Sequence, residues 1–168
     1  MIELIKYSDC FKTQTVKRIA DFFGFHSSLL NDDNELSEGN YEMASETLCE
    51  WLLPPSELYM ISLFEKVIGF LRLSYRGSNV AWIEDIYIDP KHRSKGYATQ
   101  AIKVAEEKIK ADPNYTAICF DVVPRNEAAI KLYHKLGYDS LSIITVRKEL
   151  GENKRNRIIK ISGLDFKY

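Results

Sequence analysis

The stretch that decides the fold reads Ile83-Glu84-Asp85-Ile86-Tyr87-Ile88-Asp89-Pro90-Lys91-His92-Arg93-Ser94-Lys95-Gly96-Tyr97-Ala98-Thr99. Its first half is rich in β-branched and aromatic residues and stops at a proline, which predicts a strand. A short turn follows, and Gly96 and Ala98 stand where the apolar stripe of residues 94–111 predicts a long helix. The stretch therefore predicts a strand, a tight turn and the start of a helix.

The start of that helix has the physical character of an anion site. The first N–H groups of a helix lack intrahelical partners and lie at the positive end of its dipole. Gly96 carries no side chain, so the backbone can approach a diphosphate closely, and Arg93 and Lys95 add positive charge. An ordinary strand-turn-helix with small residues at the helix entrance is the alternative interpretation.

The remaining sequence predicts a sheet around this stretch. Alternating or apolar runs predict strands at 1–7, 58–64, 67–75, 80–88, 115–123, 141–146 and 158–161, and apolar stripes predict helices at 13–23, 41–53, 94–111 and 126–136. The strand-helix-strand order at the centre requires a parallel crossover. We expect a single domain over residues 1–168 with a three-layer α/β fold, in which a mixed central sheet of about six or seven strands carries helices on both faces.

Composition excludes several classes of function. The net charge of −1 argues against binding of nucleic acid, which favours basic surfaces. No apolar run is long enough to span a bilayer, and the N-terminus predicts a strand rather than a signal peptide, so we expect a cytoplasmic protein without membrane contact. The three cysteines and three histidines lack metal-ligand spacing, which predicts no metal.

Two motifs resemble those of a known family. Arg93-x-x-Gly96-x-Ala98 is similar to the Gln/Arg-x-x-Gly-x-Gly/Ala signature of the GNAT superfamily of N-acetyltransferases, and it stands directly after a strand. The segment Asn126–Tyr138 resembles the later Asn-x-x-Ala-x-x-x-Tyr-x-x-x-Gly-Phe/Tyr pattern of the family. The sequence departs from the family at Ser94, where many members have glycine, and it has Ala98 where many have a second glycine.

The resemblance implies acetyl-CoA as the co-substrate, held between two parallel strands that splay apart, 83–88 and 117–123. It implies that backbone groups of the first strand pair with the pantetheine arm and that backbone N–H groups of the turn hold the diphosphate. Asn126 would contact the cofactor arm, although helix capping is an alternative role. The cofactor-binding residues expected in this way are Ile86, Tyr87, Ile88, Arg93, Ser94, Lys95, Gly96, Tyr97, Ala98, Thr99 and Asn126.

The implied reaction is direct attack of a primary amine on the thioester, which needs a base for the amine and an acid for the thiolate. Tyr133 matches the catalytic tyrosine of the family and is the expected acid, with a core aromatic as the alternative. Glu84 is the expected base by resemblance, because several small-amine acetyltransferases place a glutamate two residues before this point of the cofactor strand. Strand alternation places it with Ile86 and Ile88 and opposite Asp85 and Tyr87, where partial desolvation would raise its pKa toward a useful value. A structural salt bridge is the alternative role for Glu84, and Asp85 or a water chain could serve as the base instead.

The sequence says less about the identity of the acceptor amine than about the cofactor. Family members commonly build the acceptor pocket from the first helices and the loop between them, and here that loop contains Asp32, Asp33, Glu35 and Glu38. These acids favour a cationic small molecule, polyamine-like or aminoglycoside-like, although a solvated acidic loop is the simpler explanation. A protein or peptide N-acetyltransferase and a non-catalytic CoA-binding regulatory module are the competing functions. Family membership also allows a homodimer formed through the last strands.

Overall fold

The computed structural model describes residues 1–30, 41–151 and 155–168. The chain divides into two compact units, Met1–Asp121 and Val122–Tyr168, each of which is considered by itself. The expected single domain remains a prediction. The predicted acidic segment with Asp32, Asp33, Glu35 and Glu38 lies outside the described residues.

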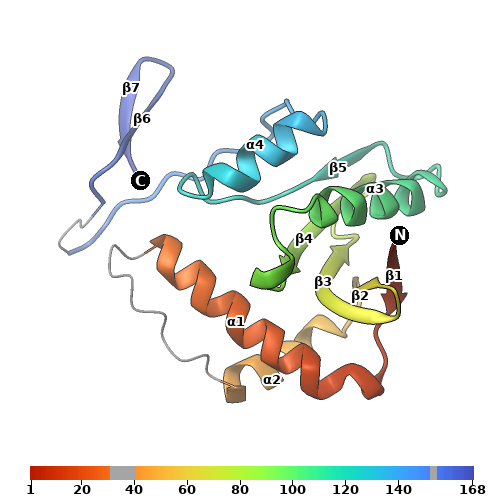
Figure 1. The fold of residues 1–168 in the computed structure, drawn as a ribbon. Helices are drawn as coiled ribbons and strands as arrows, with labels where there is room; N and C mark the ends of the chain where they lie inside the picture. Colours follow the sequence, from red (N-terminus) through yellow and green to blue (C-terminus); the bar gives the residue numbers. More distant parts are fainter. Residues whose placement is uncertain (31–40, 152–154) are drawn as a thin grey trace. The chain divides into compact units, whose positions relative to one another are not determined.

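The first unit is built on a five-stranded sheet in the order β1-β2-β3-β4-β5 (Figure 1). The strands are β1 (Ile2–Lys6), β2 (Ser56–Leu63), β3 (Lys66–Ser74), β4 (Val80–Ile88) and β5 (Ala117–Cys119). The first four pair antiparallel, and β5 joins β4 in parallel. The mixed sheet and the parallel crossover are confirmed, with five strands in place of the expected six or seven.

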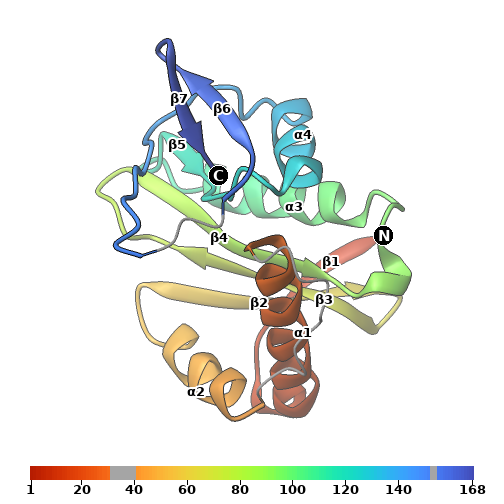
Figure 2. The same ribbon diagram turned by 90° about the vertical axis from the view of Figure 1, so that its left-hand side faces the viewer.

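Helices cover both faces of this sheet. Figure 2 shows α1 (Lys12–Leu30) and α2 (Tyr41–Trp51) on one side and α3 (Tyr97–Lys110) on the other, which confirms the three-layer arrangement. Two short 3-10 helices, η1 (Asp9–Phe11) and η2 (Pro90–His92), precede α1 and α3. The predicted apolar stripe of α3 is buried at Ala101, Ile102, Ala105 and Ile109.

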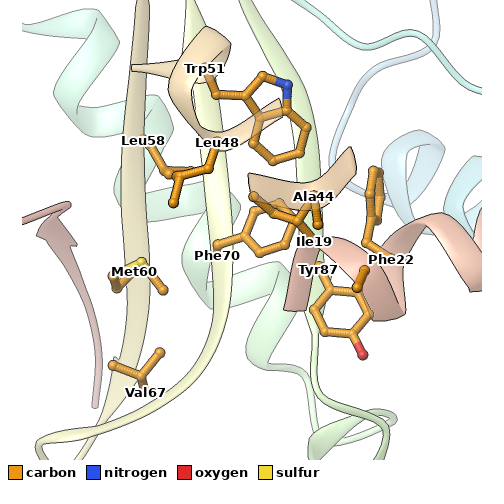
Figure 3. Packing of buried hydrophobic residues seen from close by; sticks show 11 residues of the cluster. Ile19, Phe22, Ala44, Leu48, Trp51, Leu58, Met60, Val67, Phe70 and Tyr87 are labelled. Carbon is orange, nitrogen blue, oxygen red and sulfur yellow. The ribbon is translucent and has the colours of Figure 1, made fainter. Parts of the chain in front are cut away.

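The face under α1 and α2 holds an aromatic core (Figure 3). The rings of Phe70 and Tyr87 stack at 5.7 Å between centroids, and Phe22 meets both rings edge-on. Trp51 of α2 closes the cluster against Phe70 at 5.5 Å. Burial of these large rings between two strands and two helices fixes the position of β4, from which the site is built.

The second unit contains α4 (Glu127–Lys135) and a hairpin of β6 (Ile158–Ile161) and β7 (Leu164–Lys167). The predicted strand at 141–146 is wrong: Leu141, Ile143 and Val146 are exposed, and no described strand pairs with this segment. Its apolar alternation mimics a strand, but a strand needs a hydrogen-bonded partner to form. β7 was not predicted, although Ser162-Gly163, both with positive φ, form the kind of turn that joins hairpin strands.

Within the part of the chain that the structure describes, no helix is both long and apolar enough to cross a membrane.

Candidate active site

The candidate site begins where β4 and β5 separate. The two strands pair only from Val80 to Trp82 on β4 and from Ala117 to Cys119 on β5. β4 then continues to Ile88, whereas β5 ends, so 83–88 has no strand partner on that edge among the described residues. The family resemblance implied a splayed opening between 83–88 and 117–123, and the strands stop pairing at this point, although β5 is a strand only over 117–119 of the predicted 115–123.

The open edge presents the backbone of Ile86 and Ile88 rather than that of Tyr87. The N–H of Asp89 donates to the Ile68 carbonyl at 2.8 Å, and hydrogen bonds alternate along an antiparallel pair. The groups of Tyr87 therefore turn toward β3, where its carbonyl lies so close to Gly69 that a Cβ there would collide with it. Tyr87 was expected to pair with the cofactor through its backbone, and this geometry instead makes it a core residue, 3% exposed.

The turn after β4 forms an open cradle of main chain. Ser94 and Gly96 have φ values of 59° and 77°, so the chain turns twice through the left-handed region before α3 begins at Tyr97. A Cβ at Gly96 would meet no atom within 4 Å, and no side chain caps the helix. The first N–H groups of α3 therefore have no side-chain cap and lie beside open space at Gly96, an arrangement that suits an anion such as a diphosphate. The positive φ at Ser94 also explains why a glycine suits this position.

The two cationic side chains of the turn are engaged within the protein. Arg93 donates from Nε to the Ile88 carbonyl at 3.0 Å, and its guanidinium lies over the Phe25 and Tyr87 rings. Lys95 donates from Nζ to the Lys91 carbonyl at 3.1 Å. Both add positive charge beside the cradle, and contact of a diphosphate with the main chain there remains a prediction.

Glu84 occupies a β-bulge. Arg72 pairs with Asp85 and Leu73 with Ile83, which leaves Glu84 as an extra residue on β4. The bulge interrupts the alternation that placed Glu84 with Ile86 and Ile88, whereas Asp85 and Tyr87 do face away from those isoleucines. Sequence alternation gave no signal of the bulge.

The Glu84 carboxylate, 13% exposed, forms an ion pair. Arg76 donates from Nε to Glu84 at 2.7 Å and from its terminal nitrogen to Asp121 at 2.9 Å, and its guanidinium stacks 3.7 Å from the Trp82 ring centroid. The structural salt bridge that the sequence left open for Glu84 is therefore present. Arg76, Trp82 and Asp121 were not anticipated, because the bulge and the loop at 75–79 bring them together.

Asp85 forms a second ion pair on the adjacent position. Arg72 donates from Nε to Asp85, with 2.6 Å between the atoms, and lies 4.7 Å above Trp51. Burial raises the pKa of Asp85, although Arg72 opposes this shift. Burial also lowers the pKa of His26, on which the negative charge of Asp85 acts in the opposite direction. A charged Arg72 between Leu71 and Leu73 was the sequence signal for this buried partner.

The second unit holds the remaining predicted residues. Asn126 caps α4, since its side-chain oxygen accepts from the Ala129 N–H at 3.3 Å. Gly137, with a φ of 97°, ends the helix as predicted, and the Tyr138 N–H donates to the Tyr133 carbonyl at 3.0 Å. Tyr133 is half-buried and packs edge-on against Tyr138 at 6.4 Å. Among the residues with described positions, no three acidic, histidine or cysteine side chains gather as a metal site.

Solved structures share this fold. A possible acetyltransferase from Clostridium difficile 630 aligns with a TM-score of 0.71 at 17% identity, covering 90% of this chain and 99% of that one. The PaiA N-acetyltransferase from Thermoplasma acidophilum, in complex with coenzyme A, aligns at 0.66 with 15% identity, covering 81% and 88%. An aminoglycoside acetyltransferase from an uncultured soil metagenomic sample, in complex with sisomicin, aligns at 0.61 with 12% identity, covering 89% and 97%.

The sequence itself decides the family. No protein of curated function matches it. The model of the acetyltransferase (GNAT) family matches residues 25–138, which include β4, the glycine-containing turn, α3 and the whole of α4. The chain therefore belongs to the GNAT family of acetyltransferases, whose members use acetyl-CoA.

Proposed function

We propose that this protein transfers the acetyl group of acetyl-CoA to a primary amine of a cationic small molecule, polyamine-like or aminoglycoside-like, by direct attack on the thioester. The observation that carries the proposal is the open main-chain cradle at Gly96 beside the unpaired edge of β4. The cradle suits a diphosphate, and the edge suits an extended arm with amide groups.

In this proposal the cofactor contacts are mostly main chain. The N–H groups from Ser94 to Thr99 bind the diphosphate. The outward groups of Ile86 and the N–H of Ile88 bind the pantetheine arm, because the Ile88 carbonyl already accepts from Arg93. Arg93 and Lys95 contribute charge beside them. Asn126 acts by fixing the start of α4 as well as by any contact of its own, because capping already uses its side-chain oxygen.

The chemical step needs a proton acceptor for the amine and a donor for the thiolate. We assign the donor to Tyr133 and the acceptor to Glu84, with Asp85 as the second choice. For Glu84 to act as the base, its carboxylate must accept the proton of the incoming amine while it lies beside Arg76. Burial raises the pKa of Asp85, which favours a base, but Arg72 already holds its carboxylate.

A cationic acceptor is supported by acidic side chains around the opening and by a related fold. Glu84, Asp85 and Asp121 lie at or next to the point where β4 and β5 part, and they outnumber Arg72 and Arg76. The soil-metagenome acetyltransferase of the same fold was solved with the aminoglycoside sisomicin.

The cradle is tested by titrating CoA into the protein by calorimetry, with Gly96→Ala as the variant. Gly163→Ala is a matched control, because Gly163 also has a positive φ, 80°, and open space where a Cβ would lie. Both changes carry the same backbone penalty of about 1 kcal/mol, but only a methyl at Gly96 enters the cradle. We expect about tenfold weaker CoA binding for Gly96→Ala alone. Absence of CoA binding by the unmodified protein, or equal effects of the two changes, would refute the proposal.

The acceptor is tested by free-thiol release with a panel of amines. Turnover with polyamines or aminoglycosides above that with peptide amines is the expected result. The reverse order would identify a protein or peptide N-acetyltransferase, and CoA binding without transfer to any amine would identify a regulatory module.

A further inference from the structure

A bidentate ion pair joins α1 to the residue that follows β4. The Nε of Arg18 donates to one carboxylate oxygen of Asp89 and a terminal nitrogen donates to the other, both at 2.9 Å. The two side chains are 11% and 16% exposed. Parallel hydrogen bonds between guanidinium and carboxylate fix orientation as well as distance, which a lysine cannot do.

The remaining donors of Arg18 are also used. One terminal nitrogen donates to the Val67 carbonyl at 2.8 Å, and the other donates to the backbone and side-chain oxygens of Gln14 at 3.0 and 3.2 Å. The guanidinium therefore ties together α1, the start of β3 and the end of β4. Its position is fixed from three sides.

Asp89 is the first residue of the turn that leads to the cradle. Its N–H donates to the Ile68 carbonyl and its own carbonyl accepts from the His92 N–H, both at 2.8 Å. It also precedes η2 as its N-cap, so the direction in which the chain leaves β4 is set at Asp89. Between Asp89 and Gly96 the chain contains η2 and the left-handed Ser94, which leave its backbone little conformational freedom.

α1 contacts the turn between β4 and α3 at a second point. The Arg93 guanidinium lies over the ring of Phe25, which is on α1 two turns beyond Arg18. α1 thus contacts the turn at its first residue and again just before Ser94. Neither contact touches the cradle itself.

We propose that Arg18 is a positioning residue for CoA binding, which acts through Asp89 by fixing the turn between β4 and α3. This inference rests on the proposed function, since it takes the cradle at Gly96 to be the diphosphate site. The fork geometry of the pair fixes the orientation of the turn, and removal of one partner also leaves the other charge unpaired. Loss of the pair leaves the cradle residues unchanged but lets their N–H groups diverge.

The test measures CoA affinity by calorimetry for Arg18→Gln, Asp89→Asn and the double variant. Lys17→Gln is the matched control, because it removes the same charge from the neighbouring exposed position of α1. We expect each single variant to bind CoA about tenfold more weakly and the double variant to be no worse than either, since the pair acts as a unit. Lys17→Gln should stay within about twofold of the unmodified protein.

Two further readouts separate positioning from general stability. The KM for acetyl-CoA should rise with the dissociation constant, while kcat and the KM for the amine stay near their original values. Arg18→Lys, which keeps the charge but loses the fork, should bind CoA with intermediate affinity and covers the case in which Arg18→Gln does not fold.

Unchanged CoA affinity in Arg18→Gln and Asp89→Asn, or an effect equal to that of Lys17→Gln, overturns the inference while leaving the proposed function intact. Failure of the unmodified protein to bind CoA overturns the proposed function instead. Equal losses of kcat, of CoA affinity and of amine affinity would show a structural role only, and would also overturn the inference.

Discussion

At the scale of single residues, the proposed acid role of Tyr133 can be tested by removing its hydroxyl alone. Its ring packs against Tyr138 and phenylalanine keeps that contact, so Tyr133→Phe removes only the hydroxyl. If the hydroxyl protonates the leaving thiolate, kcat should fall about 100-fold with little change in either KM. Thiol release at saturating acetyl-CoA measures the effect, with CoA calorimetry to show that binding is intact. Full turnover by Tyr133→Phe would exclude the acid role.

The partly buried His26 should make the free energy of unfolding depend on pH. Burial lowers its pKa, so between that value and the ordinary value of about 6.5 the unfolded chain binds more protons than the folded one. The free energy of unfolding should therefore fall as the pH drops below about 6.5 and through the lowered pKa. His26→Phe keeps a ring 4.2 Å from that of Phe22 and should flatten this part of the curve.

Urea unfolding at several pH values measures the slope for His26→Phe. His134→Phe is the control, because His134 is exposed on α4 and its replacement should leave the slope unchanged. A curve for His26→Phe parallel to that of the unmodified protein would contradict the prediction.

At the scale of elements, β4 and α3 could be predicted from sequence because each is strongly patterned and bounded by a residue that stops it. β4 has the predicted bounds, 80–88, and the buried stripe of α3 follows directly from its spacing. The bulge at Glu84 could not be predicted, since it is set by the register with β3. The same limit hid the ion pairs of Arg76 with Asp121 and of Arg18 with Asp89, whose partners lie far apart in sequence. In the segment 141–146 the sequence pattern predicted a strand, but no strand forms there because no described strand pairs with it.

Close approach of β3 to β4 depends on Gly69. A Cβ there would collide with the Tyr87 carbonyl oxygen and lie 3.1 and 3.2 Å from other backbone atoms of Tyr87 and Ile88, which cannot rotate away. We expect Gly69→Ala to lower the free energy of unfolding by about 1–3 kcal/mol. Weaker CoA binding should accompany this, because Ile88 belongs to the open edge.

Urea denaturation measures the loss for Gly69→Ala against Gly151→Ala. A Cβ at Gly151 meets no atom within 4 Å and its φ is not in the left-handed region, so that change should stay within about 0.5 kcal/mol. Equal stabilities of the two variants would show that β3 and β4 can move apart without cost.

At the scale of the whole molecule, the proposed binding of the cofactor and of the acceptor uses different chemical groups. The proposed cofactor site uses backbone geometry in the first unit, where β4, the turn and α1 are held by buried contacts. The proposed acceptor site uses side-chain charge, and a net charge of −1 gives the chain no strong overall field. The proposed preference for a cationic acceptor would therefore arise locally, at the carboxylates around the opening, and we expect it to weaken with added salt.

We expect the acetyl group to pass from acetyl-CoA to the amine without first being attached to a cysteine. Cys119 forms the final β5 pair with Trp82 before the strands separate, so a thiol stands at the apex of the opening. A deprotonated amine is nucleophilic enough to attack the thioester without an acyl-enzyme, so we expect direct transfer. Initial rates with both substrates varied should give intersecting lines, and the intact mass after acetyl-CoA alone should be unchanged. Cys119→Ala should keep kcat within about twofold, with Cys49→Ala, at an exposed cysteine, as the control. Parallel lines together with an acetylated chain that disappears in Cys119→Ala would show instead that the acetyl group passes through this cysteine.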